Sequence, residues 1–168
     1  MDSRQPEEIS RAVAAYHWRC RGEWSLDRWS MQLGVWHEGA LVGCQGLDAE
    51  DFLVTRTAET GSWLGMEHHG QGIGTAMRQV ICAFAFDHLD AEEVTSCAFA
   101  DNPASQAVSR KVGYRENGRR RVKRGPGQGK LAQEQLFVLC REDLNRYEEP
   151  LNVSGLEALR GSMGLGTH

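Results

Sequence analysis

Three glycines at alternate positions, Gly70, Gly72 and Gly74, stand between a short apolar run and a long helical pattern. Glycine lowers stability there unless the backbone must bend sharply or approach another group closely. A strand, a glycine-rich loop and a helix start together form an anion site, because the loop amides point inward and the helix N-terminus carries about half a positive charge. The turn therefore predicts a site for a phosphate-bearing ligand.

Three phosphate-binding devices use this arrangement, and the residues around the turn separate them. A Walker loop ends in Gly-Lys-Ser/Thr, whereas Gly74 is followed by Thr75 and Ala76. A dinucleotide fingerprint places Gly-x-Gly-x-x-Gly after the first strand, with an acidic residue about 20 positions later. Here the turn comes later in the chain and its spacing differs. The remaining device binds the pyrophosphate of coenzyme A.

Hydrophobic periodicity and turn residues predict the elements that must hold this turn. A helix is expected over residues 3–21, and a β-hairpin over 30–48 around Glu38-Gly39. Residues 150–168 are weakly patterned. Further strands are expected over 59–66, 92–100 and 131–140, and further helices over 72–88, 102–113 and 143–149.

The composition is that of a globular protein: 168 residues, 40% hydrophobic, 25% charged, with a net charge of −4. No run approaches the ~18 apolar residues of a membrane helix, and the polar start lacks a secretory signal. We therefore expect a cytoplasmic protein without a membrane partner, with one domain over 1–149 and a tail over 150–168. The cysteines are odd in number and widely spaced, which predicts reduced thiols and no zinc framework; they are Cys20, Cys44, Cys82, Cys97 and Cys140.

Two motifs carry a resemblance to a known family. The sequence HGQGIGTAM (69–77) resembles the coenzyme A loop of the GNAT superfamily of acyl-CoA N-acyltransferases, and DNPASQAVSRKVGY (101–114) resembles its next motif. The resemblance is closest to the branch that acetylates ribosomal-protein N-termini, and it covers roughly residues 30–141. It implies an α+β fold in which helices flank a mixed central sheet with splayed central strands. It also implies that the family's first strand is missing, or is replaced by the tail or a partner subunit.

The resemblance implies that acetyl-CoA is the co-substrate. Its pantetheine arm is expected between the strands 59–66 and 93–100, and its pyrophosphate on backbone N–H groups of the glycine turn. The residue Asn102 is expected to bind the cofactor, to cap the following helix, or to do both. The expected cofactor contacts are Leu64, Met66, Gln71, Gly72, Gly74, Thr75, Asn102 and Ser105.

Acyl transfer to an amine also needs proton-transfer groups. A primary amine is neutral in only about one molecule in a thousand at pH 7, so a base must remove a proton and an acid should protonate the thiolate. Glu59 matches a family glutamate and is the expected base. Many family members have a tyrosine acid where this chain has Ser109, and the ribosomal branch assigns the acid role to the serine that corresponds to Ser105. Adjacent His68 and His69 offer two ligands at most, so we expect no metal.

Two further features leave alternatives open. Seven basic residues and one acidic residue lie between Arg115 and Lys130, which predicts either a solvated hairpin loop or a surface for a phosphate or an acidic substrate. Tryptophans crowd the first half of the chain and could pack in the core or line an acceptor pocket; they are Trp18, Trp24, Trp29, Trp36 and Trp63.

The expected function is transfer of an acetyl or other short acyl group to a primary amine of a small molecule or a peptide N-terminus. A homodimer is a further hypothesis. One alternative is a non-catalytic acyl-CoA-binding domain, since Ser109 replaces the family's tyrosine acid. Another is an RNA-associated protein that uses residues 115–130. Because that stretch has no aromatic residues on which bases could stack, we do not expect a nucleic-acid partner.

Overall fold

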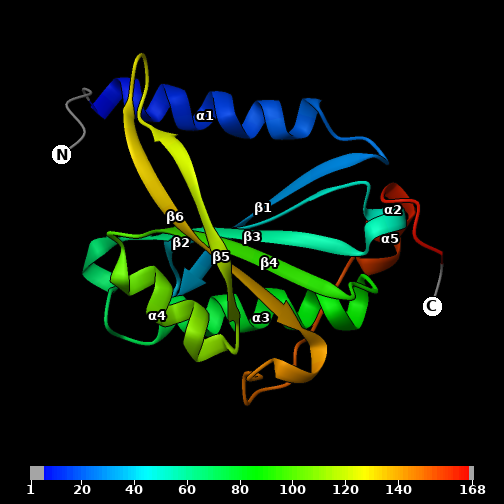
Figure 1. Cartoon of the computed structure of the whole chain (residues 1–168). Coiled ribbons are helices and arrows are strands. Elements are labelled where there is room, and N and C mark those ends of the chain that lie inside the picture. Colours follow the sequence, from blue (N-terminus) through cyan, green and yellow to red (C-terminus); the bar gives the residue numbers. More distant parts are fainter. Residues whose placement is uncertain (1–5, 167–168) are drawn as a thin grey trace.

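Six strands form one mixed sheet in the computed structural model, which describes residues 6–166 (Figure 1). The strand order is β1-β2-β3-β4-β6-β5, and within the described residues β3 and β4 are the one parallel pair of neighbours. The expected α+β class is confirmed. The strands are β1 (Arg28–His37), β2 (Ala40–Glu50), β3 (Thr57–Leu64), β4 (Glu93–Phe99), β5 (Arg115–Arg124) and β6 (Lys130–Cys140). The helices are α1 (Pro6–Gly22), α2 (Phe52–Thr55), α3 (Ile73–His88), α4 (Pro103–Val112) and α5 (Leu156–Ser162), with short 3-10 turns η1 (Met66–His68) and η2 (Arg141–Asp143).

Helices lie on both faces of this sheet (Figure 1). α3 and α4 lie against one face, which we call the α3 face, and α1 crosses the other, which we call the α1 face. α3 links β3 to β4, because two parallel neighbours need a crossover connection. Successive side chains along each strand alternate between these two faces.

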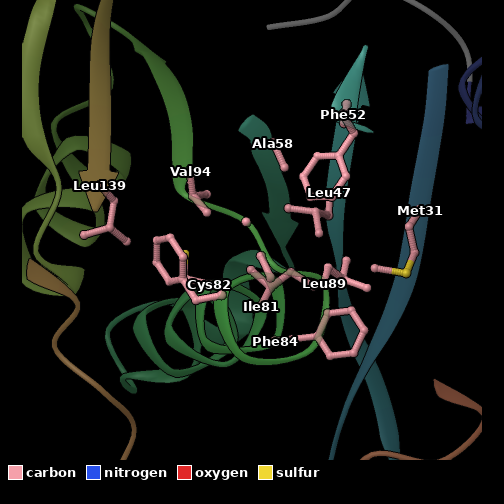
Figure 2. Packing of buried hydrophobic residues seen from close by; sticks show 14 of the residues in the cluster. Met31, Leu47, Phe52, Ala58, Ile81, Cys82, Phe84, Leu89, Val94 and Leu139 are labelled. Atoms are coloured by element: carbon pink, nitrogen blue, oxygen red, sulfur yellow. The ribbon is translucent and has the colours of Figure 1, made fainter. Parts of the chain in front are cut away.

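The hydrophobic core lies between α3 and the α3 face of the sheet (Figure 2). Ile81 and Cys82 of α3, Val94 of β4 and Leu139 of β6 are all buried in it. Burial of such side chains supplies most of the favourable free energy of folding. The largest fully buried side chains are Trp29, Phe52, Phe86, Phe137, Leu47, Leu89, Leu139 and Met163.

The first hairpin matches its sequence signal. β1 and β2 pair antiparallel around Glu38 and Gly39, whose φ angles are 50° and 80°. A two-residue turn with positive φ at both positions matches the twist of the flanking strands. The hairpin expected over residues 30–48 is therefore confirmed, and it extends a few residues further at each end.

The first helix is amphipathic in sequence but does not form a second core layer. The structure describes α1 from Pro6, so residues 3–5 of the expected helix lie outside the described residues. Val13 and Tyr16, two of its apolar positions, are 46% and 39% exposed. Both side chains line hollows between α1 and the sheet. The helix therefore covers a cleft.

Most of the basic stretch is a strand, so the loop alternative is wrong for residues 115–124, although their side chains are exposed apart from half-buried Val122. Residues 115–124 form β5 at the edge of the sheet, and the turn to β6 occupies only residues 125–129. Arginine and lysine give no apolar alternation that would indicate a strand. Backbone pairing with β6 forms it instead, and charged side chains are common on edge strands because they discourage pairing with other chains.

The polar helix expected over residues 143–149 is also wrong. The chain makes a 3-10 turn at Arg141–Asp143 and has no further helix before α5. The N–H of Asn145 donates to Val112 O (2.9 Å), and its side chain donates to Lys111 O (2.9 Å). These bonds hold the segment against the end of α4 and satisfy its polar groups outside a helix.

The residues after 150, weakly patterned in sequence, join the main core. Met163 follows α5 and is fully buried. The Arg160 guanidinium donates to His88 O (2.6 Å), so it caps the C-terminal end of α3. Within residues 6–166 this segment adds no strand to the sheet, and β1 remains an edge strand.

Candidate active site

β3 and β4 diverge after a short paired segment. Thr57–Thr60 pair with Glu93–Ser96. Beyond that point Gly61–Leu64 pair only with β2, and Cys97–Phe99 pair only with β6. The two edges that face each other can therefore accept an extended ligand that adds its own hydrogen bonds, as an added strand would. The splayed strands expected from the resemblance are present.

The glycine turn follows β3 and opens α3. Gly70 and Gly72 have φ angles of 77° and 84°, a region that favours glycine. A Cβ at either position would meet no heavy atom within 4 Å, so the space beside the turn is open. Within the described residues, the backbone N–H groups of residues 71–74 have no acceptor. Unsatisfied amides at a helix start are what an anion requires.

Some of the groups expected to bind phosphate already form hydrogen bonds within the protein. The N–H of Thr75 donates to Gly72 O (3.0 Å), so it closes the first turn of α3. The side chain of Gln71 donates to a carbonyl of η1 (2.9 Å), which leaves its backbone N–H for a ligand. The ring of His69, which replaces the family's usual Arg or Gln, lies 3.0 Å from Leu64 O and ties the turn back to β3.

Leu64 and Met66 lie in different environments. Met66 lies beyond the strand in η1 and is 84% exposed. Leu64 is the last residue of β3. Its Cδ2 lies 3.9 Å from the position that a Cβ on Gly74 would occupy, so this end of β3 is next to the start of α3. A ligand whose phosphates bind at the start of α3 thus meets the free edge of β3 at the Leu64 end.

The start of α4 confirms one of the two roles considered for Asn102. Its Oδ1 accepts a hydrogen bond from the Ser105 N–H (3.1 Å), which is an N-cap; the cofactor role stays a prediction. Ser105 is half-buried. Ser109 is buried, and its hydroxyl donates to Ser105 O (3.3 Å). α4 lies against the start of α3, because a Cβ on Gly74 would be 3.8 Å from Val108.

Glu59 lies on the α1 face two residues before β3 leaves β4. It stands opposite Asp48 of β2, and its exposed carboxylate accepts a hydrogen bond from the Cys97 thiol (3.4 Å). Burial raises the pKa of Cys97 to about 11, so the thiol keeps the proton that it donates. Because Gly61 is the first residue of the free edge, Glu59 is about 7 Å from it along the strand.

α1 leaves two hollows above the α1 face, of about 700 Å³ and 400 Å³. The larger contains Glu59, and the smaller reaches Gly61 and Trp63 at the free edge of β3. Both are lined by Tyr16 and Asp48, so together they form one trough. The larger hollow is rich in carboxylates, namely Glu23, Asp48, Glu50 and Glu59.

Asp48 is an acid that the sequence reasoning overlooked. Its carboxylate accepts hydrogen bonds from the Ser30 hydroxyl and from the Gln32 amide (3.3 Å). Burial raises the pKa of Asp48; the Ser30 bond opposes this, and the charge of Glu59 adds to it. The alternation of β2 could have indicated Asp48, because it places this residue on the face opposite buried Leu47.

The cations of β5 are partly neutralised within the protein. Arg120 pairs with Glu134 (2.8 Å) and Arg124 with Asp101 (2.9 Å). The Arg124 guanidinium also lies 4.1 Å from the centre of the Phe99 ring. These contacts reduce the positive charge available to a nucleic-acid backbone.

The tryptophans differ in burial; Trp63 lines the smaller hollow of the trough, whereas Trp18 and Trp36 line neither hollow. Trp29 is buried and Trp24 packs against the core. Trp18, Trp36 and Trp63 are 69%, 67% and 57% exposed.

The five cysteines are free thiols, as expected. Among residues 6–166, no three potential metal ligands gather at one place, and no helix is long and apolar enough to cross a membrane.

Known proteins resemble this chain in sequence and in fold. The model of a family described as acetyltransferase (GNAT) domain matches residues 2–115. YdaF of Bacillus subtilis (strain 168), named as a candidate ribosomal N-acetyltransferase, is 35% identical over 91 residues, which are 54% of this chain and 49% of that protein. The match thus spans about half the length of this curated relative.

Two solved structures share the fold. A structure named as a candidate acetyltransferase is 25% identical with a TM-score of 0.65, over 83% of this chain and 76% of that one. Mycobacterium smegmatis RimJ, solved in complex with CoA-disulfide, is 21% identical with a TM-score of 0.69, over 87% of this chain and 70% of that one.

Proposed function

Because the chain belongs to the acetyltransferase (GNAT) domain family, we propose that it transfers an acyl group, in the simplest case acetyl, from coenzyme A to a primary amine. One observation carries the proposal. The free edge of β3, Gly61–Leu64, has a helix start with unsatisfied amides at one end and an acid-lined trough at the other. An acyl donor with phosphates and a cationic acceptor would therefore meet at this edge.

The residues at the start of α3 fit the phosphates of acetyl-CoA. The amides of residues 71–74 would donate to the pyrophosphate, and the open space beside Gly70 and Gly72 gives it room. The unpaired groups of Gly61–Leu64 would hold the pantetheine arm, and an N–H there would polarise the thioester carbonyl. When bound, acetyl-CoA supplies an activated acyl group.

Glu59 and Ser105 would move the protons. Glu59 would accept a proton from the acceptor ammonium, which frees the lone pair of the amine nitrogen. The amine nitrogen would then bond to the acyl carbon as the carbon–sulfur bond breaks, and it would release its second proton to solvent, which leaves the neutral amide. The sulfur leaves with the electron pair and takes a proton from the Ser105 hydroxyl, which regains one from solvent. Asp48 lies opposite Glu59 in the sheet and would hold the ammonium form before its deprotonation.

The trough favours a cationic acceptor. Its carboxylates outnumber the two arginines that line it, Arg19 and Arg28, and Arg28 is already paired with Glu50 (3.5 Å). Small amines and peptide N-termini both satisfy this requirement, and the name of the relative YdaF adds support for a peptide. A cytoplasmic location, which the free thiols favour, and a homodimer are further hypotheses.

Thiol release from acetyl-CoA tests this proposal. The full chain is incubated with acetyl-CoA and a panel of polyamines, amino sugars and short peptides with free N-termini. Turnover with at least one amine is expected. Binding of acetyl-CoA without turnover on any amine would favour the non-catalytic alternative. A salt-sensitive RNA complex with no acyl transfer would favour the RNA-associated one.

A further inference from the structure

Arg78 of α3 is a buried cation at the closed end of the gap between β3 and β4. Its side chain lies in a residue that is only 4% exposed, and Nη1 donates to Ser96 Oγ and Nη2 to Ser62 Oγ, both at 2.8 Å. Ser96 is the last residue of β4 that pairs with β3, whereas Ser62 lies on the free part of β3. The guanidinium therefore spans the point at which the strands separate.

No anion compensates this charge within residues 6–166. None of the ion pairs there includes Arg78, and its Nε has no hydrogen-bond partner. Cys82 and Tyr114 are the nearby groups that could ionise. Burial raises the pKa of Cys82 to about 11 and that of Tyr114 well above its ordinary value, so both are neutral at pH 7. A buried guanidinium that meets only hydroxyl groups is unfavourable unless an anion joins it.

The two ends of β3 determine how an acyl donor would lie along this strand, with its phosphates at one end and its acyl group at the other. The Leu64 end is next to the start of α3, where the phosphates would bind. The thioester would then lie toward Gly61 and Ser62, at the closed end of the gap. An acyl chain that continues beyond the thioester carbonyl would run toward Ser96 and Arg78.

We propose that Arg78 selects an acyl group that ends in a carboxylate, such as succinyl, over neutral acyl groups; this inference rests on the proposed function. A carboxylate would accept paired, charge-assisted hydrogen bonds from the guanidinium and neutralise it. The transfer chemistry is unchanged, because the terminal carboxylate binds and does not react. The acyl specificity of this enzyme would then be set by a helix residue beneath the sheet.

A binding experiment tests the inference without knowledge of the acceptor. The affinities of the full chain for succinyl-CoA, butyryl-CoA and acetyl-CoA are measured by calorimetry. Butyryl is the matched control, since it has the chain length of succinyl without the carboxylate. We expect succinyl-CoA to bind about 10–100-fold more tightly than butyryl-CoA, the usual strength of a hydrogen bond to a charged group.

Two variants locate the effect. Arg78→Met should reduce the succinyl-to-butyryl preference to about one, and Arg78→Lys should keep part of it. The control is Arg160→Met, which removes another buried guanidinium, at the opposite end of α3. It should lower stability and leave the preference unchanged.

The outcomes separate the two proposals. Equal affinity of the wild-type chain for succinyl-CoA and butyryl-CoA overturns the inference even if no Arg78 variant folds. An equal loss of affinity for all three acyl-CoAs in Arg78→Met also overturns it, because Arg78 would then only brace the strands. If none of the three binds the wild-type chain, the proposed function itself fails.

Discussion

The two faces of the sheet are built from the same strands and differ in almost every physical respect. On the α3 face, Leu47 and Ala58 are buried in the core. The next residues along the same strands, Asp48 and Glu59, point to the α1 face and line a hollow of about 700 Å³. A step of one residue thus separates a position that stabilises the fold from one that is free for chemistry.

One group of buried polar side chains on the α3 face lies near the end of the β3–β4 pairing. There Thr60 bonds Tyr114 (2.9 Å), Tyr114 lies 3.2 Å from the Cys82 sulfur, and Arg78 bonds Ser96. Burial of polar groups in a mostly apolar layer costs free energy, so their presence there calls for a physical explanation. Their position where the strands separate points to the ligand gap as that explanation.

The largest predicted effect is the loss of catalytic efficiency on substitution of Glu59, on the α1 face. Glu59→Gln should lower kcat/KM by about 10²–10⁴-fold, since glutamine cannot accept the proton of the amine. Stability should change little because the side chain is exposed. Steady-state kinetics across pH, with urea unfolding as a check, measure both. Glu116→Gln on β5, an exposed acid paired with Arg110, is the control, and wild-type kinetics in Glu59→Gln would remove Glu59 as the base.

The second largest predicted effect is a loss of stability on substitution of Leu47, on the α3 face. Leu47→Ala should lower the free energy of unfolding by about 2–5 kcal/mol, because it leaves a cavity in the core. Its neighbour Asp48 supplies the matched variant, Asp48→Asn, which should change that free energy by less than about 1 kcal/mol at pH 7. Urea denaturation of both proteins is the measurement. Equal destabilisation would contradict the division of the sheet into two faces.

A third prediction concerns the glycine turn at the start of α3, where the phosphates would bind. Acetyl-CoA should raise the Tm of the wild-type chain, since a ligand at 100 times its Kd stabilises by about 2.7 kcal/mol. Gly72→Asp should abolish this rise by placing a carboxylate against the pyrophosphate. The control is Gly127→Asp in the β5–β6 turn, where φ is also positive and a Cβ also meets nothing within 4 Å. An unchanged rise in Gly72→Asp would place the cofactor elsewhere.

The smallest predicted effect is a pH dependence of the free energy of unfolding, caused by Asp48. Burial raises the pKa of Asp48, so the folded state binds this proton more tightly than the unfolded state does. The wild-type chain should therefore lose stability as pH rises from about 3.9, the usual pKa of aspartate, through the raised folded pKa. Asp48→Asn lacks this loss, so the stability of the variant relative to wild type should increase between about pH 3 and pH 7. A relative stability that stays constant with pH would show that the trough does not perturb Asp48.

Local signals in the sequence were sufficient for several elements. Glu38-Gly39 specifies its hairpin turn because the two positive φ angles involve only neighbouring atoms. Asn102 followed by Pro103 specifies the start of α4, because capping acts within one turn of a helix. The glycine turn and the two family motifs likewise indicated the family, which the comparison with known proteins shows.

Features that depend on distant partners were beyond the reach of sequence patterns. β5 exists because β6 pairs with it, and residues 143–149 avoid a helix because α4 offers better partners for Asn145. The gap between β3 and β4 opens at Gly61, because the register between strands more than 30 residues apart in the chain determines where their pairing stops.

In the sequence, Arg78 has the pattern of an ordinary helix residue, and nothing there indicates that the sheet buries it. Its burial and its missing anion arise from the packing of α3 against two diverging strands, because burial and charge compensation are properties of neighbours in space.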